Sequence, residues 1–253
     1  MSQNSSTEVV QIEKRKAIVI IAAAVIVATA LGGGLSKVGA GFAARNTNGI
    51  TVTGSAKTSA TADNAVWTLS VSLTRPTVAA AVEKVQSDVD ALTKYLTSGG
   101  VTSDQVTYGS VSTYANEQWL NGNNTGKILN YRASRDVVVR TKDVELVKKL
   151  SQSIGTILQQ GVSVNNYGPQ YYISTLSKLR PQLLAEAMKD AKIRAEAITK
   201  AVGGKVGNVQ TVRAGVFQVT TPDSTMTADT GAYDTTSIEK TVTSTVSVTF
   251  NVK

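Results

Sequence analysis

The chain contains neither histidine nor cysteine among its 253 residues. Without imidazole it lacks the commonest general base, the Ser-His-Asp and Cys-His nucleophile pairs and histidine-ligated metal sites. Without thiols it lacks disulfides, thiolate metal ligands and any thiol redox cycle of its own. Catalysis would have to use carboxylate, lysine, tyrosine, serine or threonine side chains, and we therefore expect a protein that is not an enzyme.

Aromatic residues are also scarce, at 5%, and they do not alternate with runs of lysine or arginine. The formal net charge of +8 is spread along the chain, so the sequence predicts no nucleic-acid-binding surface. Asp223, Asp229 and Asp234 share one segment but lack the spacing of a calcium-binding loop. We expect neither a metal nor a cofactor.

One uncharged stretch of 19 residues, Ala17–Leu35, has the length of a membrane span. As a helix it would reach about 28 Å, close to the ~30 Å thickness of a bilayer's hydrocarbon core. The cations Lys14, Arg15 and Lys16 precede it and predict that residues 1–16 stay in the cytoplasm while the rest crosses. The residues assigned to this anchor are Ala17, Ile20, Val25, Ala28, Leu31 and Leu35.

A cleaved signal peptide is the alternative for this segment. Val38-Gly39-Ala40 resembles a small-residue cleavage site, and cleavage there would give a secreted protein. The apolar stretch exceeds the usual ~7–15 residues of a signal peptide, which favours a retained single-pass anchor in the cell membrane. Residues 36–48 then form a polar tether to an extracytoplasmic domain of residues 49–253.

The extracytoplasmic part has the periodicities of an α+β domain. Alternating apolar residues predict strands around Ile50–Ala56 and Ala65–Leu73, joined as a hairpin at residues 62–64, and further strands follow near 105–114, 128–141 and 162–174. Residues 116–127 read as a polar loop. The tail predicts a long hairpin of 205–220 and 240–253, whose buried face would contain Val242, Val246, Val248, Phe250 and Val252.

Three helices are predicted from apolar residues at steps of three and four. The first has Pro76 in its first turn and would solvate Asp88 and Asp90; the second runs from about Val144 to Gly161; the third ends at Gly203-Gly204. Their inward residues are Val78, Val82, Val85, Val89, Leu92 and Leu96; Val147, Leu150, Ile154 and Leu158; and Leu184, Met188, Ala191, Ala195, Ile198 and Val202. The order ββα-ββα-βα-ββ predicts largely antiparallel sheet with helices on one face.

Four segments resemble the SIMPL-domain family of bacterial envelope proteins. They are ITVTGSAKTSATADNAVWTLSVS (50–72), YRASRDVVVRTKDVELVKKL (131–150), LLAEAMKDAKIRAEAITKAVGGKVGNVQTV (183–212) and TVSVTFNVK (245–253). The resemblance implies an extracytoplasmic α+β protein able to form a large hollow homo-oligomer, with links to envelope or oxidative stress. It carries over no catalytic residue.

Trp119 and Leu120 form a large apolar pair inside the predicted polar loop. They either fold back onto their own sheet or anchor a contact between subunits, where tryptophan is over-represented. The leading hypothesis is a membrane-anchored protein that assembles with itself. A ligand- or partner-binding module outside the cytoplasm is the alternative, and a hydrolase without histidine or cysteine is the least favoured.

Overall fold

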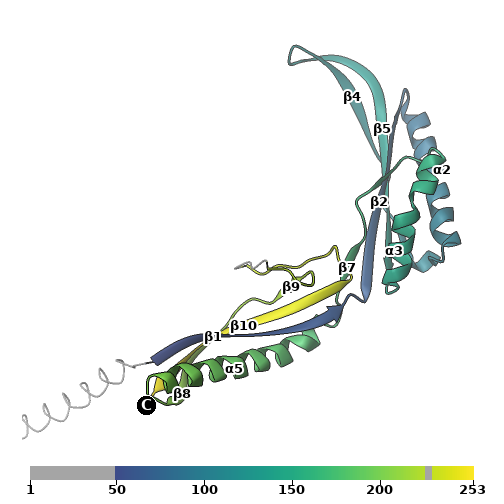
Figure 1. Cartoon of the computed structure of the whole chain (residues 1–253). Helices are drawn as coiled ribbons and strands as arrows, with labels where there is room; N and C mark the ends of the chain where they lie inside the picture. The colour runs from purple at the N-terminus through teal and green to yellow at the C-terminus, as the bar shows by residue number, and fades with distance from the viewer. Residues whose placement is uncertain (1–48, 226–229) are drawn as a thin grey trace, which may run out of the picture. The chain divides into compact units, whose positions relative to one another are not determined.

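The computed structural model describes residues 49–225 and 230–253, and its elements alternate between strands and helices (Figure 1). The predicted anchor, its flanking cations, the tether and Asp229 lie outside the described residues. The elements are β1 (Gly49–Thr61), β2 (Asn64–Arg75), α2 (Val78–Ser98), the 3-10 turn η1 (Ser103–Gln105), β3 (Val106–Tyr108), β4 (Ser112–Leu120), β5 (Asn123–Thr141), α3 (Val144–Ser153), α4 (Gly155–Gln159), β6 (Val164–Asn166), β7 (Gln170–Tyr172), α5 (Leu176–Ala201), β8 (Val206–Ala214), β9 (Gln218–Thr220) and β10 (Glu239–Val252).

The predicted α+β class with mostly antiparallel sheet is confirmed. One sheet has the order β1-β10-β8, with β9 also on β10; the other has the order β3-β5-β2-β6, with β4 on β5 and β7 on β2. Within the described part of the chain, no helix has both the length and the apolar composition needed to span a bilayer.

The predicted hairpin of β1 and β2 is wrong, because the two strands belong to different sheets. One edge of β2 pairs antiparallel with β5 from Ala65 to Arg75, and its other edge pairs with β6 and β7. Both edges are therefore occupied, and no edge of β2 remains for β1. The chain passes from the sheet of β1 to the sheet of β2 at Ala62 and Asp63, which we call the crossing. There the amide of Ala62 donates to the carbonyl of Ile238 (2.9 Å) and that of Asp63 to the carbonyl of Tyr172 (3.0 Å).

The described chain forms two compact units. The first comprises residues 49–51, 195–211 and 249–253, and the second comprises 52–194 and 212–248 apart from the undescribed residues 226–229. In the first unit, Lys205 and Lys253 exchange both of their backbone hydrogen bonds at 2.8 Å. The hydroxyls of Thr51 and Thr249 are hydrogen-bonded at 2.8 Å.

The larger hydrophobic core of the second unit lies between the β2–β5 sheet and α2, α3 and α4. The alternating apolar residues of β2 are all buried: Ala65, Trp67, Leu69, Val71 and Leu73. The polar group of the Trp67 side chain, its indole N–H, donates to Asn166 at 2.9 Å. From α2, Val85, Val89, Leu92 and Leu96 are buried as predicted, whereas Val78 in the first turn is exposed. Pro76 precedes the helix, and Thr77 is the N-cap, whose hydroxyl accepts from the amide of Ala80 at 3.2 Å.

Asp88 is a further correction, because this carboxylate is only 2% exposed. It accepts hydrogen bonds from the ammonium of Lys84, one helical turn earlier, and from the amide of Ser163 (3.2 Å). A buried carboxylate requires such partners, since an unpaired buried charge is costly. Asp88 therefore connects α2 to the segment that precedes β6.

Two predicted elements are divided by a glycine or a helix break. The second helix is interrupted at Ile154, between α3 and α4. Its last turn buries Ile157, which continues the steps of three and four from Val147, whereas the predicted Leu158 is exposed. The predicted strand 162–174 consists of β6 and β7, separated by Gly168 at φ +80°. A positive φ favours glycine and interrupts the extended backbone.

The buried face of α5 differs from the predicted stripe. It comprises Leu183, Ala187, Ala191, Ala195 and Thr199, whereas Ile198 and Val202 are exposed. Small residues face the sheet because the backbones approach closely: a Cβ added at Gly54 of β1 would lie 2.1 Å from the carbonyl oxygen of Ala187. In β10 the alternation holds for Val242, Val246, Val248 and Phe250, and Val252 is partly exposed. The predicted tail hairpin is confirmed in outline, because β8 and β9 both pair with β10; its first strand is interrupted between Ala214 and Gln218.

The buried ammonium of Lys240 is held by the segment that follows residue 230. It donates to the backbone carbonyl of Asp234 at 2.6 Å and to the carboxylate of Asp234 at 3.1 Å. Burial raises the pKa of Asp234, but hydrogen bonds from Ser237, Thr236 and Lys240 together outweigh it and hold this pKa well below the usual range. The carboxylate is therefore ionised beside a cation that has no access to water.

Replacing Asp234 with alanine should leave the Lys240 charge buried and unpaired, and we expect the free energy of unfolding to fall by about 3–5 kcal/mol. Urea denaturation measures this loss. The matched control is Asp223→Asn, which removes an exposed negative charge from the same connection and should change stability by less than about 0.5 kcal/mol. Equal losses of stability in the two variants would contradict the stabilising role that we assign to the ion pair of Asp234 with Lys240.

The ion pair of Asp234 with Lys240 also predicts how the stability of the folded protein changes at low pH. Because the pKa of Asp234 is depressed in the folded state, its stabilising contribution is complete above the unfolded pKa of ~3.9 and is lost as the pH falls below it. Asp234→Ala should therefore lose less additional stability than wild type between about pH 4 and pH 2.

Candidate protein-interaction surface

β4 and the first half of β5 form a long hairpin where the sequence predicted a polar loop over 116–127, and that prediction is wrong. Its turn consists of Asn121 and Gly122, at φ 49° and 80°. Two left-handed residues of the type Asn-Gly are typical of a two-residue hairpin turn. The dipeptide is visible in the sequence, so this hairpin was open to prediction from the turn signal even though its flanking strands are polar.

The end of this hairpin is a two-stranded ribbon. β2 pairs with β5 only from Tyr131 onward, so within the described residues the part of β5 before Tyr131 pairs with β4 alone. We call residues 112–130 the arm. Isolated two-stranded ribbons are at best marginally stable in water, so a ribbon of this kind gains from further contacts.

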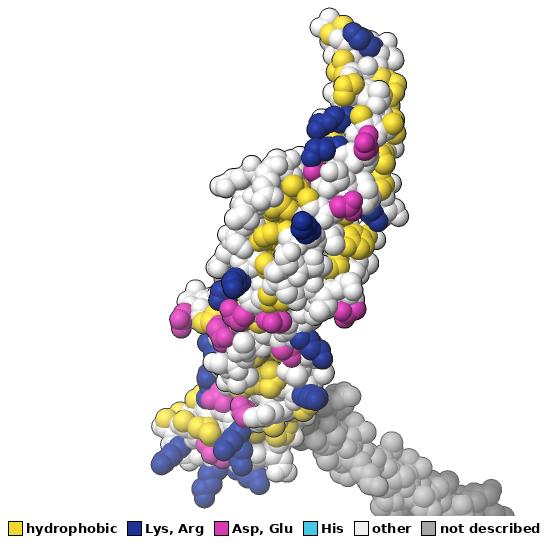
Figure 2. Space-filling model, turned by 90° about the vertical axis from the view of Figure 1, so that its right-hand side faces the viewer, with side chains coloured by type: hydrophobic (Ala, Val, Ile, Leu, Met, Phe, Trp, Pro, Cys, Tyr) yellow, Lys and Arg dark blue, Asp and Glu magenta, His cyan; other side chains and the backbone are white. Residues whose placement is uncertain are grey.

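The arm exposes large apolar side chains. Trp119 is 63% exposed and Leu120 is 57% exposed, so Trp119 does not fold back onto the sheet of its own chain. The other exposed apolar side chains of the arm are Tyr114, Ile128 and Leu129. Figure 2 shows hydrophobic side chains along this projecting part. Five exposed large apolar side chains in one short segment are more than isolated surface residues, and they favour an interaction site.

Two register shifts bend the pairing of the arm, between Asn116 and Glu117 and between Glu117 and Trp119. Bulges of this kind redirect side chains and increase the local twist. Polar contacts stabilise the irregular part: Thr125 donates to the carbonyl of Gln118 at 3.0 Å, and Asn124 contacts the carboxylate of Glu117. The bulges thus set the direction in which Trp119 and Leu120 are presented.

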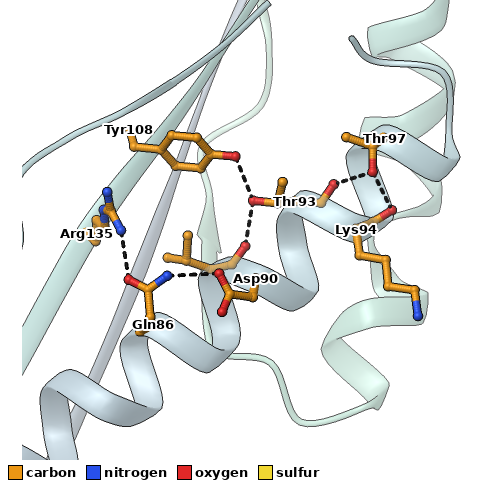
Figure 3. A pocket seen from close by; sticks show the side chains of 8 residues that line it. Gln86, Asp90, Thr93, Lys94, Thr97, Tyr108 and Arg135 are labelled. Atoms are coloured by element: carbon orange, nitrogen blue, oxygen red, sulfur yellow. Dashed lines mark hydrogen bonds between the residues drawn. The ribbon is translucent and has the colours of Figure 1, made fainter. Parts of the chain in front are cut away.

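A polar hollow of about 500 Å³ lies between α2 and the β3–β5 pair, near the start of the arm (Figure 3). Arg135 of β5 donates to the carbonyl of Gly109 (3.0 Å) and to Gln86 (2.8 Å), and its guanidinium lies 5.2 Å from the centre of the Tyr108 ring. Gln86 in turn donates to Asp90 at 2.8 Å. These contacts fix the turn at Gly109 that leads into β4.

The lining side chains of this hollow mostly satisfy one another. The hydroxyls of Tyr108 and Thr93 are hydrogen-bonded at 3.0 Å, and Thr93 also donates to the carbonyl of Val89 at 2.8 Å. No nucleophile is paired with a base in the arrangement drawn in Figure 3. We therefore interpret the hollow as the support of the arm.

A second hollow, of about 520 Å³, has a more apolar lining. Tyr167, Pro169, Tyr171 and Ile238 contribute to it, with Lys148 and Glu239 among its charged residues. Burial, and then the charge of Glu145, raise the pKa of Tyr171, so its phenol stays protonated. Aromatic side chains with a few charges suit a peptide or a small organic ligand.

Of the three aspartates singled out in the sequence, Asp223 and Asp234 lie in the described part of the chain. Among the described residues, no three acidic side chains lie close enough together to hold a metal ion. Asp234 is engaged by Lys240, and Asp223 is exposed in the same connection.

The turn of the arm can be tested separately from the rest of the fold. Gly122→Val places a β-branched residue at φ +80°, which costs about 1–2 kcal/mol and should act only on the hairpin. We expect faster hydrogen–deuterium exchange in the arm and an unchanged global melting temperature. Asn121→Gly, which accepts the same backbone conformation, is the control and should leave exchange unchanged; a large shift of the global melt in Gly122→Val would show that the arm is part of the cooperative core.

Comparisons with known proteins show what this chain is similar to. One curated relative, from Xenopus laevis, is named "Interleukin-1 receptor-associated kinase 1-binding protein 1 homolog". It is 26% identical over 167 residues, which are 65% of this chain and 62% of the relative, so the chain spans less than two thirds of that relative's length. The sequence model of the family SIMPL, described as "Protein of unknown function (DUF541)", matches residues 50–250. Because the match extends over most of the chain, this protein belongs to the SIMPL family.

Proposed function

We propose that this chain is a non-catalytic, membrane-tethered protein of the cell envelope that assembles with itself through the arm. The observation that carries the proposal is the exposure of Trp119 and Leu120 on a two-stranded ribbon. Tryptophan in such a position is a frequent anchor of protein interfaces. In the assembly that the family resemblance suggests, the arms would join subunits into a large hollow homo-oligomer.

A second copy of the chain suits the arm for two reasons. The outer edge of β4 and the part of β5 before Tyr131 leave backbone groups unpaired within the described chain, and native proteins protect or pair such edges. The arm also contains one acidic and one basic side chain, Glu117 and Lys127, so two arms have no net charge with which to repel each other. Apolar burial and strand pairing then act together.

Membrane tethering rests on the sequence of residues 17–35 and on the cations that precede it. It places the N-terminus in the cytoplasm and the SIMPL domain outside it. Tethers from one bilayer raise the effective concentration of neighbouring domains, which favours assembly through a modest interface. A secreted form after signal cleavage is the alternative arrangement.

A partner-binding module is the second candidate function. The name of the Xenopus relative describes a protein that binds a kinase, and the hollow beside Tyr167 and Tyr171 offers a place for a peptide or small ligand. In that case the arm would contact a different protein rather than a second copy.

The assembly proposal predicts the behaviour of an arm variant. Trp119→Ala combined with Leu120→Ala should lower the mass of the detergent-extracted particle, because it removes the apolar anchors of the interface. The melting temperature should stay close to wild type, since both side chains are exposed. Multi-angle light scattering measures the particle mass, and thermal denaturation measures stability.

Tyr167→Ala provides the matched control, because it removes a large side chain that is 81% exposed outside the arm. It should leave the particle mass unchanged. A wild-type chain that is monomeric at every concentration measured would refute self-assembly, and a loss of mass in the control alone would assign the interface to the second hollow.

The tether predicts the mass of the mature protein. The chain extracted from membranes should retain residues 17–35 and should remain in the membrane fraction after washing with alkaline carbonate. Intact-mass spectrometry decides between the two arrangements: a mature protein that begins near residue 41 would show cleavage and secretion instead.

A further inference from the structure

A second exposed surface, in the first compact unit, combines apolar and basic side chains. It lies where α5 ends and β8 begins, beside the end of β10. Its members, which we call the basic patch, are Ile198, Lys200, Val202, Lys205, Val252 and Lys253. Val202 is 78% exposed and Ile198 is 49% exposed, which is unusual for apolar residues that the helical periodicity predicts to be inward.

The backbone brings the end of α5, the start of β8 and the end of β10 together. The helix ends at Ala201, and Gly203 follows at φ +78°. The amide of Gly204 donates to the carbonyl of Thr199 at 2.8 Å, so the chain turns directly into β8. A Cβ added at Gly204 would lie 3.2 Å from Val252, and Lys205 and Lys253 exchange backbone hydrogen bonds. The end of α5 and the end of β10 are therefore adjacent.

The patch is cationic. In the described part of this unit, the charged side chains are Lys200, Lys205 and Lys253 with one acidic residue, Glu196. Lys200, Lys205 and Glu196 line a shallow hollow of about 440 Å³.

The chain brings this unit within reach of the predicted membrane span. Gly49, the first described residue of β1, belongs to the same unit, and a Cβ added there would lie 3.0 Å from Thr249 of β10. Only residues 36–48 separate Gly49 from Leu35, and thirteen extended residues cover at most about 47 Å. Of the described residues, Gly49 in this unit is therefore the nearest along the chain to the predicted span.

We propose that the basic patch lies on the surface of a bilayer that contains anionic phospholipids. Val202 and Ile198 would enter the interface between headgroups and acyl chains, while the lysines would place their methylene groups along it and their ammonium groups at the lipid phosphates. Two copies of the patch meeting each other would bring like charges together, which disfavours a symmetric contact between subunits. The proposal rests on the membrane tether, and it assigns to that tether an orientation of the domain on the bilayer.

The absence of cysteine makes the test direct, because one introduced cysteine labels a single position. Full-length Val202→Cys is labelled with a polarity-sensitive fluorophore and reconstituted into vesicles of phosphatidylcholine alone or of phosphatidylcholine with phosphatidylglycerol. We expect a blue shift of emission, and quenching by lipids brominated on their acyl chains, in the anionic vesicles. Tyr167→Cys, which is exposed in the other unit, is the labelled control and should show neither effect.

Charge is tested with matched triple variants of the labelled protein. Lys200→Gln, Lys205→Gln and Lys253→Gln together should abolish the blue shift in anionic vesicles. Lys57→Gln, Lys94→Gln and Lys189→Gln remove the same charge from exposed positions of the other unit and should leave the shift intact. In labelled Val202→Cys protein that retains all its lysines, added salt should reduce the blue shift, because salt screens exposed charges.

The outcomes separate the patch from the tether. Flotation with the neutral vesicles reports the tether alone, since these vesicles offer the lysines no net charge. A chain that floats but shows equal emission in both vesicle types overturns the patch proposal and leaves the tether standing. A blue shift that grows with protein concentration in detergent without vesicles overturns it in favour of a contact between copies, and a chain that does not float overturns the tether and the patch together.

Discussion

The polar groups at the crossing between the two sheets have to find partners, and much of the architecture follows from how they do so. β1 and β2 are consecutive in the chain but pair with different strands, so the residues between them cannot form a hairpin. The carboxylate of Asp63 accepts from the amide (2.7 Å) and the hydroxyl of Ser174, the hydroxyl chiefly holding the pKa of Asp63 below its usual range. Tyr171 donates its amide to the carbonyl of Thr235 at 2.8 Å, and Ile173 donates to the hydroxyl of Tyr233 at 3.0 Å. A buried polar group left without a hydrogen-bond partner at the crossing would lower the free energy of unfolding by more than a single hydrogen bond raises it.

The same crossing explains why a fully buried lysine is tolerated. Lys240 begins the buried face of β10, a position that alternation alone would give to an apolar residue. Its methylene groups pack in the interior while its ammonium holds Asp234, and Asp234 in turn accepts from Thr236 and Ser237. The ion pair therefore fixes the connection that follows residue 230 against the crossing, so that Ala62 and Tyr171 find their backbone partners there.

The arm differs from the crossing, because its large side chains are exposed instead of being paired in the interior. Its strands are polar and its pairing irregular, yet it extends beyond the sheet and presents Trp119 and Leu120 to the surroundings. A ribbon of this kind contributes little to the stability of one chain. We therefore propose that the arm acts in association with another chain. The hydrogen bonds of Arg135 fix the start of the arm. In this SIMPL-family chain, the arm and the basic patch belong to different units, and they are the two surfaces that we propose for interactions.

Much of the local structure is determined by the sequence itself. The alternation in β2 and β10 and the stepping of α2 identify their buried faces, because side-chain periodicity depends only on backbone geometry. Gly203 marks a helix end, and Asn121-Gly122 marks a turn, for reasons equally local. Only the tertiary structure decided which strands pair, since both edges of β2 are taken by segments far away in the chain. It also decided that Asp88 and Lys240 are buried with partners, that small residues of α5 face β1 across a close backbone approach, and that Ile198 and Val202 are left exposed. Those outcomes depend on the distance and chemistry of neighbours that no local pattern encodes.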